Sequence, residues 1–253
     1  GLYFGAEHVE EVLSAWRAWT DTVPDTMNSS IGLMVHPDLP FVPEPLRGRY
    51  VAHVRIAHTG GVTEGRRLVA PLKAVAPRLT DGLRDMPYTA CGSIFDDPVH
   101  PHGYAGDNVF LGSLAPSDLR AVVELAGPRA PVMCIVDIRH LGGALTRSQG
   151  APNAIGHREA AYILRVLSPV GPWSLDEVGP VHEKLLTAVA PRATGRSGSF
   201  VYGAGRPLPA GRVPTLYDTG VHERLTRLKA VHDPANTFRA NHNIRPDGHG
   251  TRP

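Results

Sequence analysis

Apolar residues recur at helical spacing in several stretches of the chain. The clearest stretch follows Ala6, where Val9, Val12, Trp16 and Trp19 fall on one side of a helix that ends before residue 24. Similar patterns predict further helices over residues 64–75, 116–125 and 175–189, and a short helix that ends near residue 95.

Other stretches alternate between two faces, as strands do. In residues 50–58, the side chains of Val51, His53 and Arg55 are expected on one face and those of Ala52 and Val54 on the other. Strands are also expected over residues 2–4, 27–36, 108–111, 132–141, 160–167 and 199–202. Because these elements do not alternate strictly as strand and helix, we predict an α+β fold: an antiparallel β-sheet with helices packed on one face. No repeat or linker interrupts residues 1–253, so we expect one domain.

The stretch over residues 221–246 combines a helix, a stop and an ordered tail. Val221, Leu225, Leu228 and Val231 form a helical apolar stripe, and Pro234 disfavours continuation of the helix. The tail that follows is expected to turn and to bury one aromatic side chain. Its main residues are Asn236, Phe238, Asn241 and Asn243.

This pattern resembles the carboxy-terminal signature of the berberine-bridge-enzyme-like FAD-linked oxidases. The signature joins a helix, an aspartate-proline-x-asparagine turn, a phenylalanine and an asparagine-x-asparagine pair. Here these are residues 225–229, 233–236, Phe238 and Asn241-His242-Asn243. Other segments resemble the substrate-binding domain of the same oxidases, in chain order from Leu2 onward.

The resemblance implies an antiparallel sheet that covers a flavin, with FAD as the cofactor. Residues 221–246 would be the segment on the flavin side, and Asn241 and Asn243 would help to hold the flavin ring. The flavin-binding half of such oxidases has no counterpart in this sequence. The implied partners are therefore a small-molecule substrate and a flavin-binding domain or subunit.

The resemblance also locates a catalytic position on the strand after the long helix. Many members of the family have Tyr-x-Asn there, whereas this chain has Phe200 and Tyr202. Phenylalanine cannot transfer a proton, so Tyr202 is the better catalytic candidate and Phe200 is expected to contact substrate.

Four more side chains are candidates because the implied strands are adjacent. His157 can accept or donate a proton near neutral pH and is a second catalytic candidate. Arg139, His140 and Tyr162 are expected to bind substrate, on the assumption that they face one cavity with Tyr202. A structural role remains open for each of them, Arg139 included.

Composition excludes several other classes of protein. The 253 residues carry a formal net charge of only +2, and the basic residues are dispersed, so we expect no nucleic-acid partner. We find neither a secretory leader nor a long apolar run, and expect a cytoplasmic protein without a membrane span. His100 and His102 lie close in sequence, but no third ligand is evident, so no metal site is expected.

Two functions follow from these observations. The first is the substrate-binding and carboxy-terminal portion of an FAD-dependent oxidoreductase that acts on a small organic substrate, such as a natural product, sugar or alcohol. The alternative is a flavin-free relative that acts as a cyclase or as a small-molecule binding protein.

Overall fold

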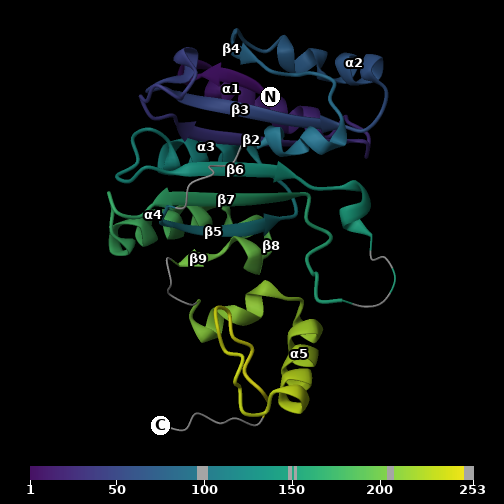
Figure 1. Cartoon of the computed structure of the whole chain (residues 1–253), viewed down its shortest axis with the longest axis vertical. Coiled ribbons are helices and arrows are strands. Elements are labelled where there is room, and N and C mark those ends of the chain that lie inside the picture. The colour runs from purple at the N-terminus through teal and green to yellow at the C-terminus, as the bar shows by residue number, and fades with distance from the viewer. Residues whose placement is uncertain (96–101, 148–149, 151–152, 204–207, 248–253) are drawn as a thin grey trace.

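The centre of the protein is a nine-stranded sheet in which all neighbouring strands are antiparallel (Figure 1). The computed structural model describes residues 1–95, 102–147, 150, 153–203 and 208–247. The strands are β1 (Leu2–Gly5), β2 (Met27–Val35), β3 (Tyr50–His58), β4 (Arg78–Asp81), β5 (Tyr104–Leu111), β6 (Ile135–His140), β7 (Tyr162–Pro169), β8 (Ala193–Gly195) and β9 (Tyr202–Gly203). Their order is β4-β1-β3-β2-β6-β7-β5-β8, and β9 also pairs with β5.

Four helices cover one face of this sheet (Figure 1). They are α1 (Val9–Thr20), α2 (Val62–Lys73), α3 (Pro116–Ala126) and α4 (Leu175–Val189). The predicted α+β fold, with an antiparallel sheet and helices on one face, is therefore confirmed. In the part of the chain that the structure describes, no helix is both long enough and apolar enough to cross a membrane.

Strand alternation explains why only one face of the sheet is apolar. Ile31 and Leu33 of β2 point toward the helices, as do Val54 of β3 and Ile138 of β6, which lie in register with Ile31. The fully buried Trp16 of α1 packs on this face, and its indole N–H donates to the Ser29 hydroxyl at 3.0 Å. We call the opposite side, which α1–α4 do not cover, the open face.

Two predictions about strands are corrected by the structure. β4 was not expected, although it completes the sheet beside β1. The strand expected over residues 199–202 is instead a 3₁₀ turn, Gly198–Phe200, followed by the two-residue strand β9. The turn forms because the side chain of Asn108 binds both backbone polar groups of Ser197, which diverts the chain from the sheet.

Residues 208–247, which we call the C-terminal unit, extend beyond the β8–β9 edge of the sheet (Figure 1). The unit contains α5 (Thr219–His232) and a small apolar cluster of Leu208, Val213 and Leu216. The predicted apolar stripe of α5 is not buried: Leu228 is 42% exposed and Val231 is 73% exposed. Phe238 was expected to be buried, but it is 82% exposed. An apolar stripe shows which side of a helix can pack against another element. In the described part of the chain, no element covers that side of α5.

Candidate functional site

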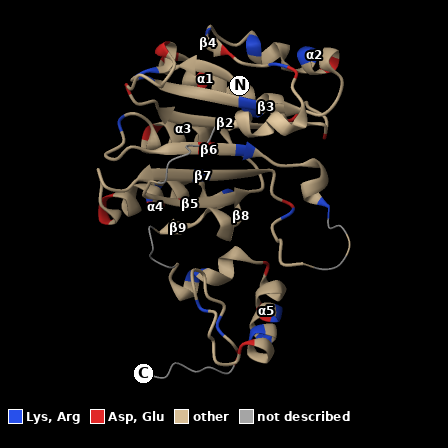
Figure 2. Ribbon diagram, viewed as in Figure 1, with Lys and Arg blue, Asp and Glu red and all other residues tan. Residues whose placement is uncertain are grey.

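Four charged side chains from three strands meet on the open face, and we call them the arginine cluster. Asp137 of β6 lies at the centre, and its side chain is only 9% exposed. Its carboxylate oxygens accept hydrogen bonds from Arg55 of β3 at 3.2 Å, Arg139 of β6 at 2.7 Å and Arg165 of β7 at 3.1 Å. Three guanidinium groups therefore share one carboxylate, and the cluster carries excess positive charge. Figure 2 shows basic positions on strands β3 and β6, which lie on either side of β2.

Strand register explains how the cluster assembles. Asp137 lies opposite Arg165 on one side and opposite Gly32 on the other. A Cβ atom at Gly32 would lie 2.8 Å from a terminal nitrogen of Arg55. The glycine in β2 therefore lets the Arg55 side chain cross that strand and reach the carboxylate.

Two phenylalanine rings lie over the guanidinium groups. The Phe95 ring centroid is 5.0 Å from the guanidinium carbon of Arg55 and 4.5 Å from that of Arg139. The Phe200 centroid is 5.3 Å from the guanidinium carbon of Arg139 and 4.1 Å from that of Arg165. Cation–π attraction favours these arrangements, so the rings and the strands together fix the positions of the three arginines.

Phe200 is positioned from the adjacent strand β5. The fully buried Asn108 donates to the Ser197 carbonyl at 2.9 Å and accepts from the Ser197 backbone N–H at 2.8 Å. These two bonds fix the start of the turn that carries Phe200. Asn108 lies in register with Arg165, which explains why the ring reaches that guanidinium.

Tyr202 lies beside the arginine cluster and is partly buried. Its ring makes an edge contact with Tyr104, with centroids 5.1 Å apart. It also crosses Gly106 of β5, where a Cβ atom would come within 2.9 Å of the tyrosine ring. Burial raises the pKa of Tyr202, although Arg165 opposes the shift. The phenol is therefore protonated at neutral pH and suits hydrogen-bond donation better than proton abstraction.

The electrostatic field of the arginine cluster extends to neighbouring histidines. Burial and the charge of Arg55 lower the pKa of His53 to about 2. The His53 ring stacks on Tyr3 with centroids 3.8 Å apart, so it is held neutral and packed. The same two causes lower the pKa of His36. The arginines, and not these two histidines, therefore supply positive charge on this part of the open face.

The structure separates the predicted site residues into groups. Arg139, Phe200 and Tyr202 lie together on the open face, and their roles stay predictions. Their neighbours His140 and Tyr162 do not join them, because both point to the helix-covered face.

Tyr162 is a core residue that is 3% exposed, and its hydroxyl is 2.6 Å from the hydroxyl of Thr20 in α1. The His140 ring lies against Tyr162, with centroids 5.8 Å apart. The expectation of one shared cavity is therefore wrong. Consecutive residues of a strand face opposite sides, so Arg139 and His140 do not contact the same ligand on one face.

His157 lies in a loop and binds the C-terminal unit. Its backbone N–H donates to a carboxylate oxygen of Asp218 at 3.2 Å, and its Nδ1 lies 3.4 Å from the same oxygen. Asp218 is the residue before α5, so the pair connects this loop to the helix. The side chain is buried against Phe110, and φ is 57°, an uncommon conformation for a non-glycine residue. These contacts account for His157 as a positioning residue of the C-terminal unit.

Asn241 and Asn243 differ in their surroundings. Asn241 is exposed and adopts a left-handed conformation with φ of 55°. Asn243 is half-buried, and its amide oxygen has no hydrogen-bond partner among the described residues. His242 Nδ1 and the amide oxygen of Asn236 lack partners in the same sense. Buried acceptors without donors fit a segment that binds a group with N–H donors.

The sequence missed Arg55, Asp137, Arg165 and Phe95 as site residues. A signal was available, because β3, β6 and β7 each place a charged residue between apolar ones, and β2, which lies between β3 and β6, contains a glycine at the matching register. His100 lies outside the described residues. Among those described, no group of three or more His, Cys, Asp or Glu side chains is arranged to hold a metal ion.

Comparison with known proteins relates the C-terminal segment to a family. The family model described as "Berberine and berberine like" matches residues 207–245. This segment is therefore similar to that family. The match confirms the resemblance inferred from the asparagine-rich tail. No curated protein matches the sequence.

Several solved structures have a similar fold over almost the whole chain. The 6-hydroxy-D-nicotine oxidase of Arthrobacter nicotinovorans matches with a TM-score of 0.67 at 16% identity, over 97% of this chain and 54% of its own. The xylooligosaccharide oxidase of Myceliophthora thermophila C1, in complex with xylobiose, matches at 0.68 and 15% identity, over 96% and 53%. A variant of berberine bridge enzyme that is a reticuline dehydrogenase matches at 0.70 and 12% identity, over 97% and 54%. The chain thus has the fold of about half of each of these proteins.

Proposed function

We propose that this chain is the substrate-binding and carboxy-terminal portion of an FAD-dependent oxidoreductase that acts on a small organic molecule. The single observation that carries the proposal is the pairing of a berberine-like tail with a substrate-domain fold whose open face bears the arginine cluster. Residues 1–253 would act as one substrate-binding unit, with 221–246 on the flavin side.

The substrate is proposed to lie against Arg139, Phe200 and Tyr202. Guanidinium groups donate to oxygen-rich or anionic groups, and the phenylalanine rings suit a flat or apolar part of the molecule. The Nε of Arg165 has no hydrogen-bond partner among the described residues, so its N–H can donate a hydrogen bond to an acceptor group of a ligand. Similar proteins are named for a nicotine derivative, for xylooligosaccharide and for reticuline, which is a wide chemical range.

The C-terminal segment fits the flavin that the proposal requires. The unpartnered amide oxygen of Asn243 can accept a hydrogen bond from an N–H group, and the left-handed Asn241 turns the chain beside it. When bound, FAD supplies the redox chemistry by accepting the equivalent of a hydride. The residues of this chain bind and orient the substrate and exclude water from it.

The visible absorbance of the protein tests the proposal directly. We expect the native-length protein to have the spectrum of oxidised flavin. When oxygen is excluded and a suitable alcohol or sugar is added, this spectrum should disappear. This chain alone, incubated with FAD and then freed of excess, reports whether it retains flavin without the other half. If the native protein contains no flavin, the proposal of an FAD-dependent oxidoreductase is contradicted.

Tyr202→Phe is expected to slow flavin reduction about 100-fold in the flavin-loaded protein, because the hydroxyl that holds the reacting oxygen of the substrate in position is lost. FAD content should stay unchanged. Tyr217→Phe is the matched control, because this tyrosine packs on the cluster of Leu208, Val213 and Leu216. Equal rates for both variants, measured by stopped-flow absorbance, would remove Tyr202 from the proposed site.

The exposed apolar surface of the C-terminal unit is proposed to pack on the flavin-binding half. Phe238→Ser is expected to reduce self-association of the isolated chain, because the ring is 82% exposed and free for contact between molecules. Analytical ultracentrifugation over a range of concentrations measures this. A chain that is monomeric before and after the change would argue against a docking surface at Phe238.

Two observations favour the alternative, a flavin-free cyclase or small-molecule binding protein. Phe200 has no proton to transfer, and burial raises the pKa of Tyr202. A site without a base can still hold a flexible substrate in a reactive conformation. Tight binding of a substrate-like molecule by a native protein without flavin would favour this alternative.

A further inference from the structure

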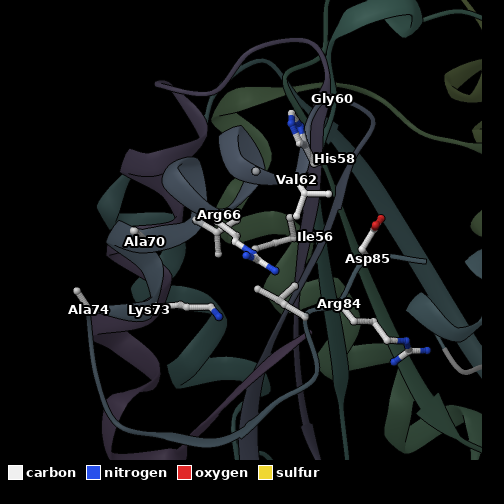
Figure 3. Close-up of a pocket in the computed structure, with 13 residues that line it drawn as sticks. Ile56, His58, Gly60, Val62, Arg66, Ala70, Lys73, Ala74, Arg84 and Asp85 are labelled. Atoms are coloured by element: carbon white, nitrogen blue, oxygen red, sulfur yellow. The ribbon is translucent and has the colours of Figure 1, made fainter. Parts of the chain in front are cut away.

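A cavity lies on the helix-covered side of the sheet, where α2 packs over β3 (Figure 3). Its volume is about 600 Å³, which is within the range of small-molecule sites. Ile56 and His58 line it from β3, and their side chains face away from the open face that carries Arg55. The cavity is therefore separate from the arginine cluster, and the segment 83–85 forms its far wall.

The walls combine an apolar base with a basic rim. The base includes Ile56, Val69 and Leu83. The charged lining residues besides His58 are Arg66, Lys73, Arg84 and Asp85. Three cations and one carboxylate line the cavity, and Lys73 is paired with Asp81 beside it, so one positive charge is left over to favour an anionic ligand.

Arg66 is the cation most available to a ligand. Lys73 already pairs with Asp81 at 2.8 Å, and Arg84 donates to the Ser93 hydroxyl at 3.1 Å. Arg66 has no ion pair or hydrogen bond with any described residue. Figure 3 shows Arg66 and Lys73 extending from α2 toward the space beside Ile56. A guanidinium group with free donors at the mouth of an apolar cavity suits a carboxylate.

His58 supplies an unpartnered polar atom at the other end of the cavity. Its side chain is only 9% exposed, and its Nε2 is buried without a hydrogen-bond partner among the described residues. Nδ1 lies 3.3 Å from the carbonyl oxygen of Thr26, so Nδ1 carries the hydrogen and Nε2 is left as an acceptor. The nearest acidic atom to Nε2 is a Glu64 oxygen at 3.8 Å, beyond hydrogen-bond distance.

Two glycines make room for this imidazole. A Cβ atom at Gly60 would lie 2.6 Å from His58 Nε2, and one at Gly65 would lie 2.8 Å from Cδ2. Larger residues at either position would displace the ring. The loop before α2 and the first turn of α2 therefore leave room for the His58 ring, whose Nε2 has no hydrogen-bond partner among the described residues.

We propose that this cavity binds a small organic anion with an apolar body and a hydroxyl group. The anionic group lies at Arg66 and Lys73, the apolar body lies on Ile56, Val69 and Leu83, and the hydroxyl donates to His58 Nε2. The ligand class is a hydroxylated aryl or alkyl carboxylate. The site stands apart from the open face and does not depend on the proposed function.

Binding of 6-hydroxy-2-naphthoate to the chain, measured by isothermal titration calorimetry, tests the site. Arg66→Gln is expected to weaken binding roughly tenfold, because one charge-assisted hydrogen bond is lost. Arg67→Gln is the matched control, because Arg67 is the adjacent exposed arginine of α2 and does not line the cavity. The uncharged amide of the probe should bind at least tenfold more weakly. Ala70→Phe should abolish binding, because it fills the cavity.

Three results would overturn the proposal. Equal weakening by Arg66→Gln and Arg67→Gln would show a diffuse attraction to basic surface. Equal affinity for the acid and its amide would exclude recognition of the anion. A complete lack of binding would contradict the site. Binding that Arg139→Gln abolishes and Arg66→Gln leaves intact would show that the ligand binds at the open face and not in this cavity.

Discussion

Lowering the pH from 7 to 4 is expected to reduce the free energy of unfolding by on the order of 5 kcal/mol, largely through two histidines. Burial, with the charge of Arg55, lowers the pKa of His53 to about 2. Burial lowers the pKa of His182 to about 4, although Asp107 opposes the shift, and its Nε2 lies 2.9 Å from the Ser168 hydroxyl. Both pKa values lie below the unfolded value of 6.5, so stability is fully present above that pH. It falls as acid protonates the unfolded state first, by about 1.4 kcal/mol per pH unit for each group.

Urea unfolding at several pH values between 7 and 4 measures this loss. His182→Gln keeps a hydrogen-bonding side chain but cannot titrate, so the pH dependence should become shallower by about one proton. His232→Gln is the control, because His232 is exposed at the end of α5. An unchanged pH dependence in His182→Gln would contradict the assignment of this histidine.

Asp137→Ala is expected to lower the free energy of unfolding by about 3–5 kcal/mol, the cost of removing one partner from a buried ion-pair network. The carboxylate is 9% exposed and accepts from three guanidinium groups, two of which belong to side chains only 12% exposed. Without it, three positive charges would repel one another at short distance. Chemical denaturation at neutral pH, monitored by tryptophan fluorescence, measures the loss.

Asp25→Ala is the matched control for the arginine cluster. Its carboxylate is 71% exposed and lies 3.6 Å from Arg147, which is itself 61% exposed. Solvent screens such a pair, so the expected loss is below about 1 kcal/mol. Similar losses in the two variants would show that Asp137 does not hold the cluster together.

Sequence patterns predicted much of the sheet because strand alternation is a local property. The strand over residues 50–58 matches β3, and the helix over 175–189 matches α4. The edge strand β4 was missed, since it has only four residues and none is buried. The turn Gly198–Phe200 was also missed, because it depends on Asn108, about ninety residues earlier in the chain.

The candidate site was predicted only in part, for the same physical reason. Arg139, Phe200 and Tyr202 were found from a family pattern, but a pattern does not state which face of the sheet each residue occupies. Register decided that, and it assigned His140 and Tyr162 to the core. Asp137, which binds three arginines from different strands, has no local signal of comparable strength.

The sequence by itself determined the fold class and the similarity of residues 207–245 to the berberine-like protein family, because periodicity and short motifs are properties of consecutive residues. Only the tertiary structure decided that three arginines converge on Asp137, that Phe238 is exposed, and that a basic cavity lies between α2 and β3. Each of these depends on the distance between residues far apart in the chain. Strand register and packing set those distances, and no single stretch of sequence contains them.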